Sequence, residues 1–352
     1  MARWTRRPWA ALIVAGTLLV GACSGGDEPT PTEEAVELVE DEAAQETTTT
    51  TEPKVQAPLS GLPVTEEAAG RAAVSIKVDN SNDGRPQAGL EKADIIFEEK
   101  VEGGVTRFIA VYQSQESELV GPIRSLRTTD RPVVSAFRGV FAFSDGVAFT
   151  LNRLKGAPVV AVTERDDAAA FINPKGRRRP YATFATTARL RREAGDGAQP
   201  PAGAFPFLSE GQAFAPEGAT PATKASINYG GKTTGAFEWD EATGRWQRSS
   251  NGTPHLLVDG TRLSFTNVII QKVGYRKVGY NDSSKNPVEE AVVVGEGEAF
   301  VLAGGKQVKA RWSKASPEAM TVFTDAGGAP ISLLPGPTMI ALAPTTAPIS
   351  IT

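Results

Sequence analysis

The chain contains 352 residues and has a formal net charge of −4 at pH 7, with 37 lysines and arginines against 41 aspartates and glutamates. This nearly balanced charge does not favour nucleic acid as a partner. A single histidine and a single cysteine exclude a multi-histidine metal centre and an internal disulfide framework. We expect no metal and no cofactor.

The first 22 residues have the pattern of a secretory signal peptide. Three arginines precede a mainly apolar stretch of eleven residues, Ala10 to Val20, which is too short to span a bilayer. The only cysteine, Cys23, follows Val20-Gly21-Ala22, a sequence that resembles the bacterial lipobox. We predict that Cys23 carries a lipid after cleavage and anchors the protein to the cell membrane on its extracytoplasmic face. A free thiol behind an ordinary signal peptide is the alternative.

Residues 23–57 are predicted to form an acidic, disordered tether. This segment holds ten acidic residues, one lysine and five consecutive threonines. It has too few large apolar side chains to offset the entropy lost on folding. As a flexible linker it would reach roughly 30 Å. The remaining body has 33 lysines and arginines against 31 acidic residues, so it is close to neutral.

Residues 58–195 are predicted to form a mixed α/β N-terminal domain. Ala73–Val78 alternates as a half-buried strand, Ile95–Val101 and Val105–Tyr112 form a hairpin, and Val133–Phe143 has the composition of buried structure. Thr183–Ala194 has a helical pattern.

Residues 196–221 are rich in Pro, Gly and Ala and are predicted to link two domains. Residues 222–352 are predicted to form a β-rich C-terminal domain, because short apolar runs alternate there with glycine-rich turns. Phe237, Trp239 and Trp246 are candidate cross-strand partners in its core; a sugar-stacking platform of exposed aromatic residues is the alternative. The fold class is therefore α+β.

The hairpin carries an unusual number of charges. If Gly103 and Gly104 are the two central residues of a tight turn, counting places Glu98 opposite Ile109 and Lys100 opposite Arg107. One face then collects the apolar side chains, and Glu99 alone violates the pattern. The other face collects four charged residues: Glu98, Lys100, Glu102 and Arg107.

Two interpretations of this charged face remain open. In the first, it is a solvated surface whose ion pairs contribute about 0–1 kcal/mol each. In the second, Glu98 and Glu102 line a polar cleft. On a straight strand these two residues lie about 13 Å apart, which exceeds the roughly 5–9.5 Å between glycosidase carboxylates. A mechanism with two carboxylates would need a bent strand or another acid, such as Asp130 or Asp145.

A second polar cluster lies between Gly121 and Arg131, where Arg124, Ser125 and Arg127 follow a Gly-Pro turn. Guanidinium groups gathered in this way suit the bidentate binding of a carboxylate or a phosphate. Structural ion pairing with Glu98 or Glu102 explains the arginines equally well.

Spaced motifs run along the whole body. They include Asn80, Arg85-Pro86-Gln87, Gly89-Leu90, Ala93-Asp94-Ile95, Glu98, Glu102-Gly103-Gly104, Thr106-Arg107-Phe108 and Gly121-Pro122-Arg124-Ser125-Arg127, and further on Gly252-Thr253-Pro254-His255, Asn267-Val268-Ile269 and Leu334-Pro335-Gly336. Together they resemble the YerB-type lipoproteins, a bacterial family classed as a domain of unknown function. The resemblance implies a surface-anchored envelope protein with an α/β-type N-terminal domain and a β-rich C-terminal domain, and it supplies no established reaction.

Three other motifs are weaker. A Ser-His-Asp triad would have to use His255, and Ser144 only approximates a nucleophile elbow. Asp79–Gly84 is similar to the start of a calcium loop, but its twelfth position is Leu90 instead of glutamate. Gly230–Thr233 lacks the first glycine of a phosphate-binding loop.

Two functional hypotheses follow. In the first, the protein is an envelope lipoprotein whose N-terminal cleft binds an anionic cell-wall glycan component such as peptidoglycan, with Asn80, Arg85, Glu102, Arg107, Arg124, Ser125 and Arg127 as ligand-binding residues. If it is an enzyme, Glu98 is the general acid for glycan cleavage, because a carboxylate does that work without histidine, cysteine or metal. In the second, the protein is a non-catalytic scaffold that recruits another envelope protein. The sequence does not decide between an enzyme and a binding protein.

Overall fold

The computed structural model describes residues 54–195, 198–230, 233–282 and 285–352. The predicted signal peptide, the lipidation site at Cys23 and nearly all of the predicted tether lie outside these ranges. Among the described residues, every helix is too short or too polar to cross a membrane.

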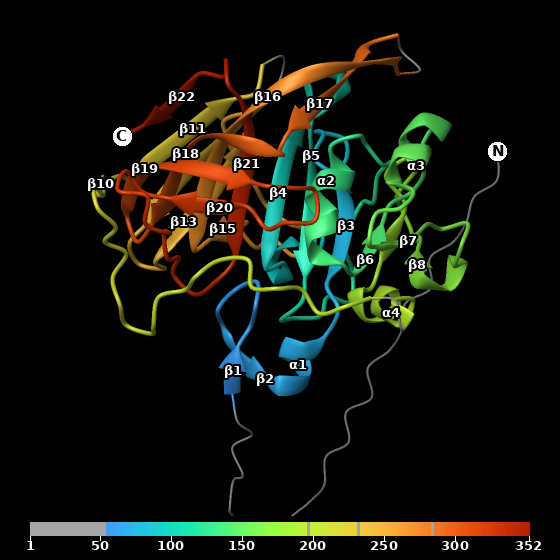
Figure 1. Cartoon of the computed structure of the whole chain (residues 1–352). Coiled ribbons are helices and arrows are strands. Elements are labelled where there is room, and N and C mark those ends of the chain that lie inside the picture. Colours follow the sequence, from blue (N-terminus) through green and yellow to red (C-terminus); the bar gives the residue numbers. More distant parts are fainter. Residues whose placement is uncertain (1–53, 196–197, 231–232, 283–284) are drawn as a thin grey trace, which may run out of the picture. The chain divides into compact units, whose positions relative to one another are not determined.

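A sheet of twelve strands forms the framework (Figure 1). Ten of its strands follow one another in the order β10 (Thr220–Pro221), β19 (Lys306–Lys314), β18 (Gly295–Ala303), β16 (Asn267–Asn281), β21 (Thr338–Pro344), β4 (Ile95–Lys100), β5 (Thr106–Tyr112), β3 (Val74–Asp79), β6 (Val140–Ala142) and β7 (Val160–Val162). Two further strands extend it, because β17 (Pro287–Val292) pairs with β16 and β20 (Val322–Thr324) pairs with β19.

This sheet joins the two halves of the chain. Strand β21, from the C-terminal half, pairs in parallel with β4, from the N-terminal half, with Thr338 opposite Ile95 and Leu342 opposite Glu99. Figure 1 shows β21 beside β4. The hydrogen bonds of the sheet therefore run without a break across the predicted division between residues 58–195 and 222–352.

A second sheet of six strands comes entirely from the C-terminal half. Its strands are β14 (Thr253–Pro254), β13 (Arg245–Ser250), β12 (Thr234–Asp240), β11 (Lys224–Asn228) and β22 (Ile349–Ile351) in that order, with β15 (Ser264–Phe265) paired to β13. Trp239 lies opposite Trp246, and Phe237 and Trp246 are buried. This confirms the prediction of core positions for Phe237 and Trp246, whereas Trp239 is half-buried and packs against the core from its edge.

The remaining elements are short. They are the strand pairs β1 (Lys54–Gln56) with β2 (Pro63–Thr65) and β8 (Phe171–Ile172) with β9 (Phe184–Ala185), and the helices α1 (Glu66–Gly70), α2 (Asp130–Val134), α3 (Ala148–Leu154) and α4 (Thr187–Arg192). The predicted helix over residues 183–194 thus begins with a two-residue strand. Strands contain far more of the described residues than helices do, and the α+β class is confirmed.

The central strands are buried on both faces. Every residue of β5 is buried, and successive side chains of a strand point to opposite faces. Phe108 and Ala110 pack with Phe237 and Trp246 of the six-stranded sheet. On the opposite face, Ile109 and Val111 pack with residues of α2 and β18. Polar side chains on these strands are therefore enclosed between layers, unless they lie at a strand end.

Candidate functional site

The register of the hairpin differs from the prediction by one residue. Glu98 lies opposite Phe108 and Glu99 lies opposite Arg107. Three residues, Glu102 to Gly104, separate the closing pair, in which the Val101 N–H donates to the Val105 carbonyl at 2.9 Å. A one-residue shift moves every side chain of a strand to the other face. The prediction that Glu98 and Arg107 share a face was wrong; Glu99 is the acid on the same face as Arg107.

Glu98 instead faces the C-terminal half of the chain. Both of its carboxylate oxygens accept hydrogen bonds from Arg248 Nη2 of β13, at 2.7 and 2.8 Å. Asn80 Nδ2 and Thr106 Oγ1 donate to Oε1 at 3.0 and 2.7 Å, and the Tyr229 hydroxyl donates to Oε2 at 3.1 Å. The side chains of Glu98 and Arg248 are both 0% exposed.

Arg248 continues this network to the single histidine. Its Nη1 donates to Ser250 Oγ and, at 2.6 Å, to His255 Nδ1. Since a guanidinium group can only donate, His255 Nδ1 is the acceptor, and Nε2 carries the proton that it donates to Gln87 Oε1 at 2.8 Å. Burial and the charge of Arg248 lower the pKa of His255 well below its usual value, so the ring is neutral. We call this set of hydrogen-bonded side chains the buried network; its members are Glu98, Asn80, Thr106, Tyr229, Arg248, Ser250, His255 and Gln87.

The contacts of the buried network indicate a structural role and not a catalytic one. Its carboxylate is saturated with donors, and its histidine contacts Arg248, Ser250 and Gln87 but no aspartate in the described ranges. A general acid must reach the proton acceptor of a substrate, and a carboxylate without exposed surface does not. The catalytic role of Glu98 therefore stays a prediction that this geometry does not favour.

A second buried charge cluster lies on the other face of the same strands. Lys77 Nζ of β3 donates to both Glu99 and Asp130, and the three side chains are at most 1% exposed. The Arg127 N–H donates to the second Asp130 oxygen at 2.6 Å. Burial raises the pKa of Asp130, partly offset by Lys77. Lys77 was not predicted as a site residue, although a lysine inside an apolar strand is a signal that the sequence carries.

The predicted ligand-binding arginines do gather in one place. Arg124 Nε pairs with Asp79 at 2.7 Å, and Arg127 Nε pairs with Glu102 at 2.7 Å. Arg107 Nη1 donates to the carbonyl oxygen of Ser125 at 2.9 Å. The Arg124 and Arg127 side chains are 18% and 20% exposed, so both are only partly accessible to solvent.

Arg107 differs from its neighbours because it forms no ion pair within 4.0 Å among the described residues. It is 6% exposed, and its Nε is buried without a hydrogen-bond partner in this part of the chain. Burial, followed by the charges of Arg127 and Arg124, lowers the pKa of Arg107 to about 10. The group is still a cation at neutral pH.

The other predicted ligand-binding residues divide between these clusters. Asn80 belongs to the buried network. Arg85 hydrogen bonds Asn82 at 2.6 Å and feels the charges of Arg248, Glu98 and Asp79, which places it near both groups. Ser125 contributes its backbone carbonyl. We refer to Arg85, Arg107, Arg124 and Arg127 as the arginine cluster.

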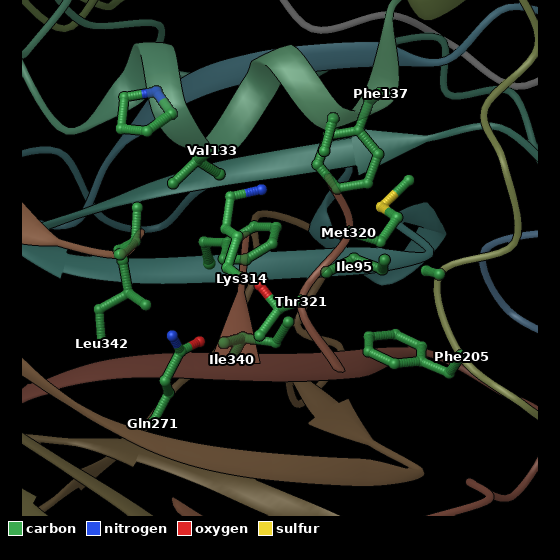
Figure 2. Close-up of a pocket in the computed structure, with 15 residues that line it drawn as sticks. Ile95, Val133, Phe137, Phe205, Gln271, Lys314, Met320, Thr321, Ile340 and Leu342 are labelled. Carbon is green, nitrogen blue, oxygen red and sulfur yellow. The ribbon is translucent and has the colours of Figure 1, made fainter. Parts of the chain in front are cut away.

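An apolar pocket lies beside α2 (Figure 2). Figure 2 shows Lys314 and Gln271 among mainly apolar side chains such as Val133, Ile340 and Leu342. The cavity measures about 30 Å³, which suffices for only about one or two water molecules. Burial lowers the pKa of Lys314 to about 8. The pocket is too small for a sugar or a wall polymer.

Sequence and structure comparisons place the chain among known proteins. Residues 59–199 match the N-terminal domain, and residues 225–340 the C-terminal domain, of a family described as protein of unknown function (DUF3048). A relative from Bacillus subtilis (strain 168), YerB, which is named as a lipoprotein, is 43% identical over 88 residues. That match spans 25% of this chain and 27% of the relative.

The fold also matches a solved structure. The crystal structure of the YerB protein from Bacillus subtilis aligns with a TM-score of 0.72 at 22% sequence identity. The alignment covers 84% of this chain and 100% of that structure. At this level of identity the match establishes the fold, and the chemistry has to be argued from the residues of this chain.

Proposed function

The chain belongs to the DUF3048 family, and we propose that it is a lipid-anchored protein of the cell envelope that binds an anionic wall component without cleaving it. The arginine cluster is the binding surface in this proposal. The buried network is the connection that holds the two halves of the chain together.

The observation that carries the proposal is the unpaired positive charge of the arginine cluster. Its four guanidinium groups have two ion-paired carboxylates, those of Asp79 and Glu102. Arg107 is buried near the charges of Arg124 and Arg127, so water screens its charge less well than it would screen a surface charge. A bound carboxylate or phosphate would offset this excess, and guanidinium groups bind such anions in bidentate geometry.

We propose binding without cleavage because of the position of Glu98. The general acid of a glycosidase must protonate the oxygen of the leaving group. Glu98 is enclosed between two sheets and binds Arg248 through both oxygens. Glu102 is paired with Arg127 and lies in the hairpin loop. Neither carboxylate has the freedom that this chemistry requires.

The envelope location rests on the N-terminal residues. Lipidation at Cys23 after removal of residues 1–22 would place the body outside the membrane, at the end of the acidic tether. The lipoprotein name of the relative supports this assignment. The scaffold hypothesis stays the alternative, and the burial of Phe237 and Trp246 leaves these two aromatic side chains unavailable to a partner protein.

Incubating the purified protein with purified peptidoglycan tests both parts of the proposal. We expect the protein to sediment with the polymer and to release no reducing sugars. The folded fraction of the Glu98→Gln variant should bind as the wild type does. Sugar release by the wild type that the Glu98→Gln variant lacks would overturn the non-catalytic part. Protein that stays in the supernatant at physiological salt would overturn the binding part.

A further inference from the structure

A cavity of about 230 Å³ with both charged and apolar side chains in its wall is built from both halves of the chain, and none of its lining residues belongs to the arginine cluster. The N-terminal half contributes Thr128, Arg131 and Arg153, and the C-terminal half contributes Arg276 and Glu290. A water molecule occupies about 30 Å³ in the liquid, so the cavity has room for a group of several heavy atoms. We call it the Arg131 pocket.

Two groups in this pocket lack partners. The Thr128 hydroxyl is buried without a hydrogen-bond partner, and the residue is 2% exposed. Arg131 makes no side-chain hydrogen bond and no ion pair with any described residue, and its Nε is buried. Buried donors are nearly always satisfied in folded proteins. A ligand that accepts hydrogen bonds from both would satisfy them.

The charge of the pocket is also out of balance. Arg153 and Arg276 each pair with Glu290, at 2.7 Å to its two oxygens. Glu290 is 5% exposed, whereas Arg153 and Arg276 are 40% and 63% exposed and stand toward solvent. Three guanidinium groups therefore meet one carboxylate, which leaves an excess of two positive charges.

The walls of the pocket are held in place by contacts outside it. The ring of Phe149 in α3 stacks on Tyr280 of β16, with centroids 5.5 Å apart and planes 7° apart. The Ala291 N–H of β17 donates to Thr129 Oγ1 at 3.0 Å. These contacts join α3 and the segment before α2 to strands β16 and β17, so the donors are positioned before a ligand arrives.

We propose that this pocket binds a phosphate monoester. Such a group carries about −1.5 to −2 charges at pH 7 and has three strongly accepting oxygens, which matches the excess charge and the unpaired donors. Arg131 binds it in bidentate geometry and Thr128 donates to a third oxygen. A phosphodiester offers less charge and fewer terminal oxygens, so it binds more weakly.

Isothermal titration calorimetry on the purified protein tests this site, with glycerol 1-phosphate as the probe and diethyl phosphate as the diester control. The wild type binds the monoester, and Arg131→Gln weakens binding by at least about tenfold. Thr128→Val weakens it by roughly threefold without lowering the melting temperature, because the hydroxyl it removes has no protein partner. Arg192→Gln, an exposed arginine without a side-chain contact among the described residues, leaves binding unchanged.

Three results would overturn the proposal: no binding of glycerol 1-phosphate at millimolar concentration, unchanged binding by both pocket variants, or equal affinity for the diester. Dihexanoyl phosphatidate, a monoester on a lipid, separates two sources of the ligand. Tighter binding than glycerol 1-phosphate identifies a lipid headgroup, and weaker binding identifies a soluble phosphate. The Arg131→Gln variant keeps the arginine cluster intact, so this site and the proposed wall-binding surface fail or succeed separately.

Discussion

Arg248 donates through Nη2 to both carboxylate oxygens of Glu98, and this ion pair connects strand β4 of the N-terminal half to strand β13 of the C-terminal half. Neither side chain is exposed. The two residues are 150 positions apart in sequence. Together with the parallel pairing of β21 and β4, this contact makes the two halves one hydrogen-bonded unit.

The Glu98→Gln variant is expected to lose about 3–5 kcal/mol of unfolding free energy, because it leaves the Arg248 charge buried and uncompensated. Urea denaturation at pH 7 measures the loss. The matched control is Glu289→Gln, which breaks a part-exposed pair with Lys100 and should cost at most about 1 kcal/mol. Equal losses in the two variants would contradict a structural role for the buried pair.

Replacement of Lys77 by methionine is expected to destabilise the protein by about 3–5 kcal/mol at pH 7.5, since the Glu99 and Asp130 carboxylates lose their shared cation. The raised pKa of Asp130 sets the direction of the pH effect. A buried acid with a raised pKa binds its proton more readily in the folded state, so stability falls as pH rises through its titration.

The Lys77→Met variant should therefore recover part of its stability between pH 7.5 and pH 5, as its carboxylates take up protons. Denaturation curves at the two pH values, each compared with the wild type, measure this recovery. A destabilisation that does not change with pH would show that lost packing, not buried charge, is the cause.

The lowered pKa of Lys314 predicts how the unfolding free energy changes at alkaline pH. Its folded-state pKa of about 8 lies below the ordinary value of 10.5, so between these values the unfolded chain holds a proton that the folded chain has released. The unfolding free energy should therefore rise as pH increases across this range. The Lys314→Met variant should lack this rise and should be more stable than the wild type at pH 7, by on the order of 1 kcal/mol. Parallel pH profiles for both proteins would refute it.

Replacing Arg107 by methionine tests its contribution to binding separately from its contribution to stability. Methionine keeps most of its apolar volume and removes a buried cation that lies near Arg124 and Arg127. The Arg107→Met variant should therefore change the unfolding free energy by no more than about 1 kcal/mol, while its affinity for anionic wall polymer falls. Thermal melting and co-sedimentation measure the two effects. A loss of stability together with unchanged binding would assign Arg107 to the core alone.

The sequence predicted much of the fold because the strands carry strong local patterns. Ile95–Val101 and Val105–Tyr112 became β4 and β5 to within one residue at their ends. The register failed because a two-residue and a three-residue glycine loop cannot be distinguished from composition alone, and the difference inverts the faces. The partner of Glu98 could not be found, because Arg248 reaches it only through the packing of two sheets.

The arginines between Gly121 and Arg131 were identified as a candidate anion site from their spacing. Their internal pairing with Asp79 and Glu102 depends on strand ends that meet only in the folded chain. The Arg131 pocket likewise forms only in the folded chain, because Arg276 and Glu290 come from a hairpin more than a hundred residues away from Arg131. Local patterns gave the strands, whereas tertiary packing decides which charges remain unpaired.

The most direct test of wall binding by the arginine cluster is the dissociation constant for purified peptidoglycan, measured by co-sedimentation at physiological salt for the wild type and an Arg85→Gln/Arg107→Met double variant. Neither residue forms an ion pair among the described side chains, so the double variant should stay folded. We expect the double variant to bind at least about tenfold more weakly and Arg192→Gln to bind as the wild type does. A folded double variant with wild-type affinity would contradict wall binding by the arginine cluster.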